Sequence, residues 1–173
     1  MTNWREAAIA MTHEIERKLD KLGLALPPAR ERMGNFLGGV QVHDLLFLSG
    51  QGSQDHLGAV GAEFDVDDGY AAARECALYL LARIKEELGT LDRVARIVKL
   101  LGFVHCTPDF DKAPLVINGA SDLLIELYGD AGRHARSAIG AVALPRNFAV
   151  EIEMVVQVAS DERHGGPNTY REG

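Results

Sequence analysis

The sequence predicts an α+β protein in which two long helices cover one face of a single mixed sheet, with an extra helix near the N-terminus. Apolar residues recur at steps of three and four from Asp67 to Leu88, which is typical of a helix with one buried face. A turn at 108–111 begins a second helix of the same kind, which continues through Ile117 to Tyr128. Runs rich in branched residues, bounded by turn-forming residues, come before, between and after these stretches. These patterns predict strands that pair beneath two helices.

The expected order is helix, two strands, helix, strand, helix, two strands. An amphipathic pattern predicts the first helix from Ala10 to Leu22, and Pro27-Pro28 indicate an extended arm over 24–35. Asp67 is the candidate N-cap of the first long helix, and Gly89 ends it. The remaining expected segments are strands at 36–42, 45–49, 94–106, 134–140 and 148–156, and an exposed loop at 53–64.

A chain of 173 residues is long enough for one domain of ordinary size. We expect that domain to span residues 34–159. Residues 1–33 are expected to supply the N-terminal helix and an arm that packs on the domain. Residues 160–173 are polar and rich in glycine, which predicts a frayed tail.

The last expected strand alternates between two kinds of side chain. Apolar residues occupy every second position from Val150 to Val156, and Glu151 and Glu153 stand between them. A sheet with helices on one face needs cover on the other face. Burial of that second face between subunits would supply it, so we expect a closed oligomer.

Composition excludes several classes of function. The formal net charge is -7, and no run of lysine or arginine builds a positive stripe, so nucleic acid is not an expected partner. The chain has no stretch of 18 apolar residues and no apolar core of a signal peptide, so we expect a cytoplasmic protein without a membrane partner. Cys76 and Cys106 match no redox or metal spacing and are expected to be free and structural. The six histidines also lack ligand spacing, and no metal is expected.

Arg136 and Glu151 are the candidate catalytic residues. They lie on two short apolar segments joined by Leu144-Pro145, which predicts a hairpin that holds both side chains on one wall of a pocket. The planar guanidinium of arginine fits a carboxylate with two hydrogen bonds, and a nearby carboxylate can accept a proton or orient a water. This pair suits a small carboxylic acid. The alternative is an ordinary salt bridge at a sheet edge.

Ser49-Gly50-Gln51-Gly52 interrupts the second strand. Glycines at this point allow the backbone to approach a ligand closely, or they mark a strand that turns out of the sheet. No Gly-x-Ser-x-Gly motif surrounds Ser49, so a hydrolytic triad is not expected.

The order and spacing of several short motifs resemble the reactive intermediate deaminase A family, also called the YjgF/YER057c/UK114 family, over residues 34 to 159. These motifs are Ser49-Gly50-Gln51, Leu91-Asp92-Arg93, Asp109-Phe110, Asn118, Ala135-Arg136-Ser137, Leu144-Pro145 and Val150-Glu151-Ile152-Glu153. The resemblance implies a chorismate-mutase-like fold and a homotrimer with one site at each subunit interface. It also implies hydrolysis of 2-enamine or 2-imine acids to 2-keto acids and ammonia, with no cofactor.

The resemblance implies roles for individual residues as well. Arg136 would bind the substrate carboxylate, Glu151 would orient the attacking water, and Asn118, Ser49 and Gly50 would line the pocket. The family's usual tyrosine is Phe36 here, which removes one hydroxyl partner, and a frequent cysteine is Ala138. Three function classes therefore stay open: an imine deaminase, a non-catalytic binder of small carboxylates, and an endoribonuclease or translation inhibitor. The acidic charge balance counts against the third class.

Overall fold

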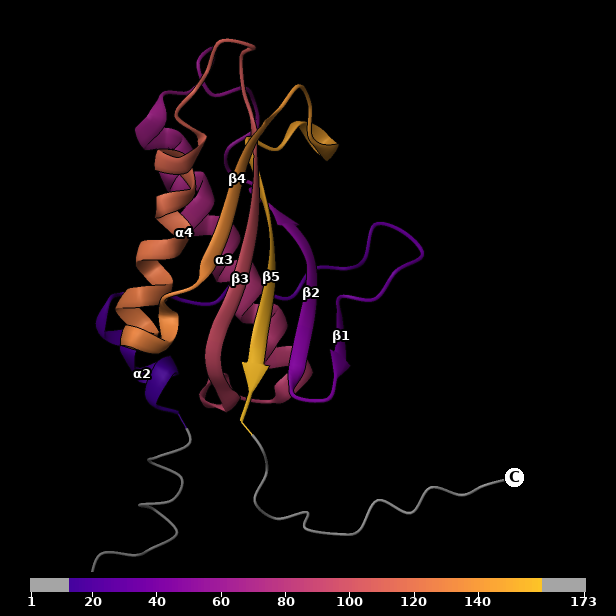
Figure 1. Ribbon diagram of the computed structural model, residues 1–173, viewed down its shortest axis with the longest axis vertical. Helices are drawn as coiled ribbons and strands as arrows, with labels where there is room; N and C mark the ends of the chain where they lie inside the picture. Colours follow the sequence, from indigo (N-terminus) through magenta and orange to yellow (C-terminus); the bar gives the residue numbers. More distant parts are fainter. Residues whose placement is uncertain (1–12, 160–173) are drawn as a thin grey trace, which may run out of the picture.

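A computed structural model describes residues 13–159 of the chain. They form a five-stranded mixed sheet in the order β1-β2-β5-β3-β4 (Figure 1). The strands are β1 (Gly39–Val42), β2 (Leu45–Gly52), β3 (Val94–His105), β4 (Ala135–Ala141) and β5 (Val150–Val158). The helices are α2 (Glu14–Lys21), α3 (Val66–Leu88) and α4 (Ala113–Tyr128), with short 3-10 turns at Leu91–Arg93, Gly129–Gly132 and Pro145–Asn147. The expected α+β design is confirmed.

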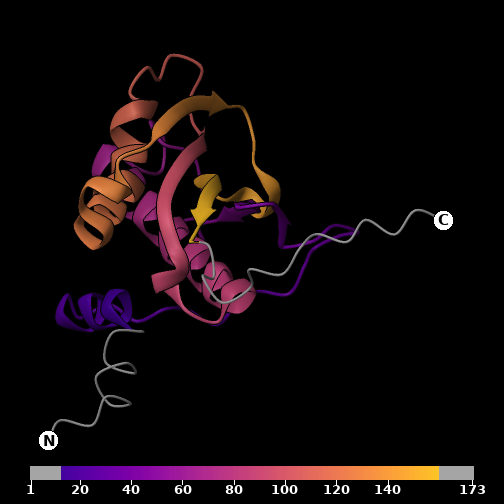
Figure 2. The ribbon, with the colours of Figure 1, turned by 60° about the horizontal axis from the view of Figure 1, so that its bottom comes forward.

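Helices α3 and α4 lie side by side on the same face of the sheet, as Figure 2 shows from a second direction. Their apolar faces and one face of the sheet form the core, in which Leu80, Ile117 and Ile152 are fully buried. No helix within residues 13–159 is both long enough and apolar enough to cross a membrane.

Helix α3 begins earlier than the sequence pattern indicates, whereas α4 follows the turn that the pattern predicts. The N-cap of α3 is Asp65 rather than Asp67, because the Asp65 carboxylate accepts hydrogen bonds from the backbone N–H groups of Asp67 and Asp68. Helix α4 begins at Ala113, just after the turn expected at 108–111. The backbone N–H of Phe110 donates to the carbonyl of Thr107 at 3.1 Å and closes this turn.

The predicted hairpin of the last two strands is wrong. Strand β4 pairs in parallel with β3, and β5 pairs antiparallel with both β2 and β3. Helix α4 crosses over the sheet between β3 and β4, so β4 arrives on the outer side of β3. The chain then returns past β3, and β5 enters the centre of the sheet.

The first two strands also differ from their expected bounds. Strand β1 begins only at Gly39, and β2 continues through Ser49 and Gly50 to Gly52. The pairing of β2 with β5 shifts between Leu48 and Gln51, so Ser49-Gly50 form an irregularity inside the strand rather than its end.

The described part of the expected N-terminal helix is α2, whose Ile15 and Leu19 are buried in the core cluster. Figure 1 shows α2 at the lower end of α4. Residues 1–12, which include the expected start of this helix at Ala10, lie outside the described residues. The expected tail, 160–173, does so too.

The face of the sheet away from α3 and α4 carries large apolar side chains that stay exposed. Those about half exposed are Val40 (46%), Val42 (51%), Phe47 (46%) and Ile139 (49%). The paired residues Val40 and Phe47 share a face, and so do Val42 and Leu45. We call this the open face. Its apolar residues, unlike those at alternate positions of β5, find no cover within residues 13–159.

Candidate active site

Glu151 lies on β5 and projects from the open face, because its neighbours Val150 and Ile152 are buried beneath the helices. It lines a cavity of about 820 Å³ together with Gly50 of β2 and Phe36, which follows the arm. Glu151 forms no hydrogen bond or ion pair with any other residue in 13–159. Burial raises the pKa of its carboxyl above the usual value, and the nearby Glu153 raises it further. Such a carboxylate is a candidate general base.

Gly50 makes room for the Glu151 carboxylate. A methyl group at position 50 would overlap Glu151 Oε1 and would lie only 3.0 Å from its carboxyl carbon. The irregularity of β2 at this point turns Gly50 toward β5, so the missing side chain leaves the carboxylate its place. Ser49 does not line the cavity: its Oγ donates a hydrogen bond to the carbonyl of Leu37 at 2.7 Å and ties the arm to β2.

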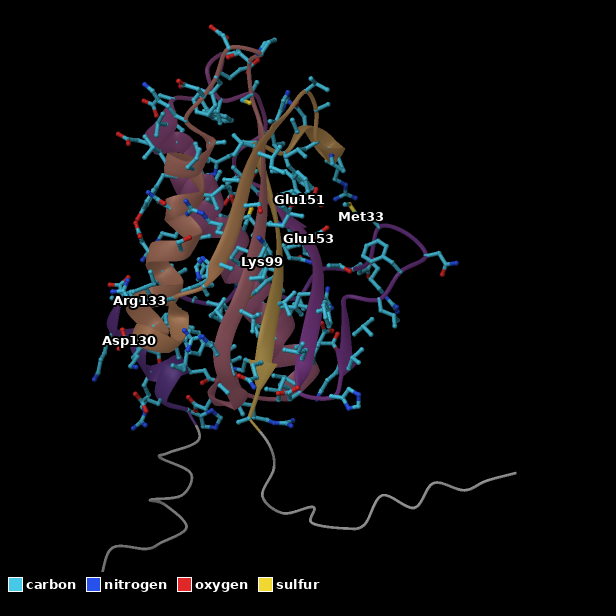
Figure 3. All side chains as sticks on the ribbon, viewed as in Figure 1. Met33, Lys99, Asp130, Arg133, Glu151 and Glu153 are labelled. Atoms are coloured by element: carbon cyan, nitrogen blue, oxygen red, sulfur yellow. The ribbon has the colours of Figure 1, made fainter. Side chains whose placement is uncertain are left out.

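Phe36 lies between the arm and β1 and is 45% exposed. Figure 3 shows Met33 of the same arm projecting past β2, and Glu151 and Glu153 on β5. The phenyl ring offers an apolar wall to the cavity and no hydroxyl.

Arg136 lies on β4 and points to the helix-covered side, away from the open face. Its Nη1 donates to Asn118 Oδ1 and to Ser121 Oγ, both at 2.9 Å, and its Nη2 donates to the carbonyl of Pro114 at 3.1 Å. All three acceptors belong to α4. Asn118 therefore holds Arg136, and these bonds fix the orientation of the guanidinium before any ligand arrives.

Ser121 is a site residue that the sequence interpretation missed. It lies three residues after Asn118 on α4, and this helical spacing was the available signal, since such residues share a face. Ser121 Oγ also lies 3.1 Å from His134 Nε2, and His134 Nδ1 lies 2.6 Å from the carbonyl of Gly132. A carbonyl only accepts, so Nδ1 carries the proton and Nε2 accepts from Ser121. Burial lowers the pKa of His134, which agrees with a neutral ring.

Arg136 and Glu151 do not meet within one chain. Strand β3 separates their strands, and Arg136 is paired with Leu100, whereas Glu151 is paired with Phe103 on the other face. Leu100 is fully buried on the helix side. The structure thus brings Phe36, Gly50 and Glu151 together at one place, and Asn118, Ser121 and Arg136 at another. Ala138 lies on β4, the strand that carries Arg136, and packs against the core.

Both cysteines are free, as predicted. Cys76 is fully buried in α3, where its Sγ lies 3.3 Å from the carbonyl of Val150, and burial raises the pKa of its thiol. Cys106 is partly buried beyond the end of β3.

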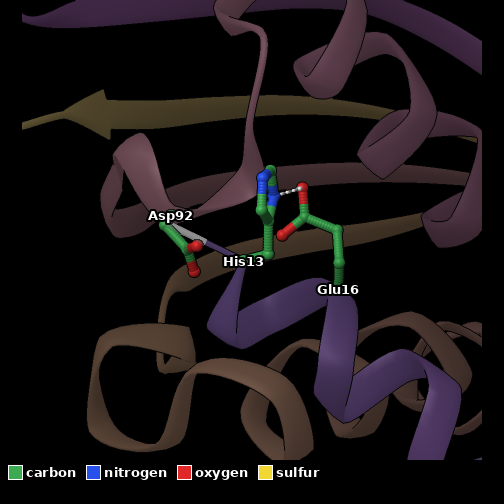
Figure 4. A group of neighbouring side chains, drawn as sticks. All are labelled: His13, Glu16 and Asp92. Carbon is green, nitrogen blue, oxygen red and sulfur yellow. Dashed lines mark ion pairs between the residues drawn. The ribbon is translucent and has the colours of Figure 1, made fainter. Parts of the chain in front are cut away.

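His13, Glu16 and Asp92 lie close together at the start of α2 (Figure 4). Both carboxylates have structural tasks there. The Asp92 oxygens accept hydrogen bonds from the backbone N–H groups of Glu14 and Ile15 at 2.8 and 3.0 Å, and Glu16 Oε1 accepts from that of Leu91 at 3.3 Å. This group therefore docks α2 onto the 3-10 turn before β3.

We call these two groups of residues half-sites: Phe36, Gly50 and Glu151 form one, and Asn118, Ser121 and Arg136 form the other. The fold and the half-sites together define a class of small mixed-sheet proteins. Comparison with known proteins identifies the family. Residues 16–157 match the family described as "YjgF/chorismate_mutase-like, putative endoribonuclease". The chain belongs to this family.

Individual relatives agree with the family. The chain is 38% identical over 157 residues to Protein TCP17 of Trypanosoma cruzi, which covers 87% of this chain and 98% of that protein. It is 36% identical to the protein Atu1372 of Agrobacterium tumefaciens, described as of unknown function, with a TM-score of 0.82 over 91% of this chain and 100% of that one. RidA from the Antarctic bacterium Psychrobacter sp. PAMC 21119 shares the fold, at 22% identity and a TM-score of 0.52 over 75% of this chain and 94% of that one.

Proposed function

We propose that this protein hydrolyses reactive 2-imine and 2-enamine acids to 2-keto acids and ammonia, in a pocket completed between subunits. The observation that carries the proposal is Glu151, a half-buried carboxylate with a raised pKa and no partner within residues 13–159, on the wall of a cavity large enough for a small acid. Its freedom from Arg136 leaves it available to a water.

The reaction asks little of the protein, because an imine carbon is already electrophilic. Glu151 would accept a proton from a water as the water oxygen bonds to that carbon. The protonated Glu151 would then return that proton to the nitrogen, which gives a carbinolamine. A second proton would pass from the carbinolamine hydroxyl through Glu151 to the nitrogen as the carbon–nitrogen bond breaks, so that ammonia leaves and the carbonyl forms. Arg136, held by α4, would bind the substrate carboxylate and orient the carbon toward the water.

The separation of the half-sites supports an assembly in which Arg136 of one copy faces the Glu151 cavity of the next. Strand β4 is an edge strand, so it can approach a neighbour. A head-to-tail contact repeated around an axis makes a closed ring, and the exposed apolar residues of the open face would be buried inside it. We propose a homotrimer, as the family resemblance implies.

A carboxylate-binding protein without catalysis is the second candidate. Phe36 favours it, because the cavity wall lacks a hydroxyl at this position that could hold a water or a substrate nitrogen. Binding would need Arg136 but would leave the free Glu151 without a task.

Two variants distinguish the candidates. The assay follows imine decay by semicarbazide trapping while a dehydratase supplies the imine, and calorimetry measures binding of 2-oxobutanoate. Glu151→Gln should bind the keto acid but lose roughly 10²–10⁴-fold in turnover, since general-base catalysis is worth about this much. Arg136→Ala should lose binding by about a hundredfold or more, because the substrate carboxylate loses its bidentate partner.

A wild-type protein that binds 2-oxobutanoate and never accelerates imine decay would replace the deaminase with the binding protein. Equal binding by wild type and Arg136→Ala would show that the site lies elsewhere.

A further inference from the structure

The cavity beside Glu151 has an unusual number of guanidinium groups for a protein of net charge -7. Four arginines line it, contributed by the arm, by α3 and by the turn before β5: Arg30, Arg32, Arg83 and Arg146. The carboxylates on the same wall are Glu31 and Glu151. Two more acids lie just behind it, where Glu75 is 4.0 Å from Arg30 and Glu86 pairs with Arg83.

Arg83 fastens the arm to the helix layer. Its side chain is only 9% exposed, and its Nη2 donates to the carbonyl of Arg30. The guanidinium packs flat on Gly38, where an added methyl group would lie 2.8 Å from Nε. Arg83 and Glu86 therefore form a structural pair that fixes the position of the arm.

Arg30 is held in one orientation at the back of the cavity. Its guanidinium stacks on the ring of Tyr79, with 3.5 Å from Cζ to the ring centroid. When the Gln54 amide presents its oxygen, that oxygen accepts from Arg30 Nε at 2.7 Å and from Nη2 at 3.1 Å. These contacts leave Nη1 without a hydrogen bond to any other residue in 13–159.

Arg146 is the arginine whose placement is hardest to explain by the fold alone. Its backbone has φ 53 and ψ 22, a left-handed conformation that is strained for a residue with a long side chain, and Asn147 follows with φ 61. The Arg146 side chain makes no hydrogen bond or ion pair with other residues in 13–159. Strained backbone that presents an unpaired charge on a cavity wall is typical of a binding site.

We propose that Arg146, with Arg32 and Arg30, forms a second anion subsite, and that the substrates are 2-imino acids with a further carboxylate at the end of the side chain. This inference rests on the proposed function, in which Arg136 binds the first carboxylate. Glu75 and Glu86 balance Arg30 and Arg83, whereas Arg32 and Arg146 have no carboxylate partner in 13–159. A distal carboxylate pairs with these charges on the wall that Glu151 shares.

Calorimetry with product analogues tests the subsite. The probes are 2-oxoglutarate and its 5-methyl ester, which keeps the open chain and the keto group without the second charge. Wild type should bind 2-oxoglutarate about tenfold more tightly than the ester, as a charge-assisted hydrogen bond allows. Arg146→Asn should reduce that preference to about twofold, because asparagine tolerates the left-handed backbone but carries no charge. Arg146→Lys should retain most of it.

The control is Arg74→Gln. Arg74 pairs with Glu126 between α3 and α4, on the outer side of the helix layer, so this variant removes the same charge at a distance from the cavity. It should leave both affinities unchanged. Equal binding of the two probes to wild type would overturn the subsite. An Arg146→Asn variant that weakens both probes alike would also overturn it, since Arg146 would then hold the first carboxylate.

Imine trapping on the same preparations separates the two proposals. Accelerated imine decay without a preference for the second carboxylate overturns the subsite alone. No acceleration, whichever keto acid binds, overturns the proposed hydrolysis and with it the imine as the occupant.

Discussion

Glu151 illustrates how the burial of a single residue links function to stability. Its carboxyl is half buried, and both burial and Glu153 raise its pKa above the ordinary value of 4.5. A raised folded-state pKa means that the charged form is less favourable in the folded protein than in the unfolded chain. Below pH 4.5 the Glu151 carboxyl is protonated in both states, and its contribution to folding stability is fully present. That stability is lost as the pH rises through the raised pKa of the folded state, because the folded protein must then bury a charge.

Glu151→Gln should consequently be more stable than wild type at pH 7, because the variant has no charge to bury. The difference should vanish below pH 4.5, where wild type is protonated in both states. Urea midpoints of the two proteins at several pH values measure this. A variant that is less stable than wild type at pH 7 would show that Glu151 has a stabilising partner in the assembled protein.

Gly50 should be intolerant of even the smallest side chain. Gly50→Ala places a methyl group on Glu151 Oε1, so the carboxylate must move. Turnover should fall by about tenfold to a hundredfold, because displacement of a catalytic group by about 1 Å reduces the rate by about this much. Gly34→Ala in the arm is the matched control, because its methyl group would meet only Phe36 at an ordinary 3.4 Å. Imine trapping compares them, and equal turnover of Gly50→Ala and wild type would contradict the role of Glu151.

At the scale of elements, contacts between segments distant in sequence complete the start of helix α2 and orient Arg136 on β4. Helix α2 has no side-chain cap of its own at His13, and Asp92 caps it from a position 78 residues beyond Glu14. Helix α4 supports β4 in a comparable way, because its Asn118 and Ser121 accept hydrogen bonds from Arg136 and orient the guanidinium. Helix α2 thus depends on a distant segment, and helix α4 supports one.

Asp92→Ala should release α2 from the domain. The loss of a capping carboxylate costs about 0.5–2 kcal/mol of unfolding free energy. Denaturant unfolding measures this cost, and Asp20→Ala is a control on the exposed face of the same helix. Equal losses in both variants would show that Asp92 acts through general charge rather than as a cap.

The whole molecule has its two half-sites on opposite faces of one sheet, so its proposed activity depends on assembly. The protein should behave in light scattering as a particle of three times the 18.8 kDa chain mass. A mass of one chain at micromolar concentration would contradict the proposed trimer and leave Arg136 far from Glu151.

Mixing two inactive variants gives a sharper test of that arrangement. Glu151→Gln and Arg136→Ala should each be inactive alone, but random mixing in one ring joins an intact Arg136 to an intact Glu151 at about one quarter of the interfaces. Co-expressed variants should therefore recover roughly a quarter of wild-type turnover. The double variant Arg136→Ala/Glu151→Gln, mixed with either single variant, is the control that should recover nothing. No recovery by the complementary pair would place both residues in one subunit's site.

The sequence by itself determined the local structure and the chemistry available to this protein. The three-to-four residue spacing of apolar side chains predicts α3 and α4, and the alternation from Val150 to Val156 predicts which residues of β5 are buried. These signals are local, because each arises within one element. The motifs around Ser49-Gly50, Arg136 and Glu151 were also sufficient to indicate the family.

Only the tertiary structure decided which of these residues meet. Whether β5 lies beside β4 or is inserted between β2 and β3 depends on the crossover of α4, and sequence spacing carries no record of that choice. The strand order separates Arg136 from Glu151, and the packing of the arm on Arg83 brings Arg30 to the cavity that Arg146 lines from the turn before β5. Pairing between distant segments maximises burial of the whole chain, so it cannot be read from any single stretch of it.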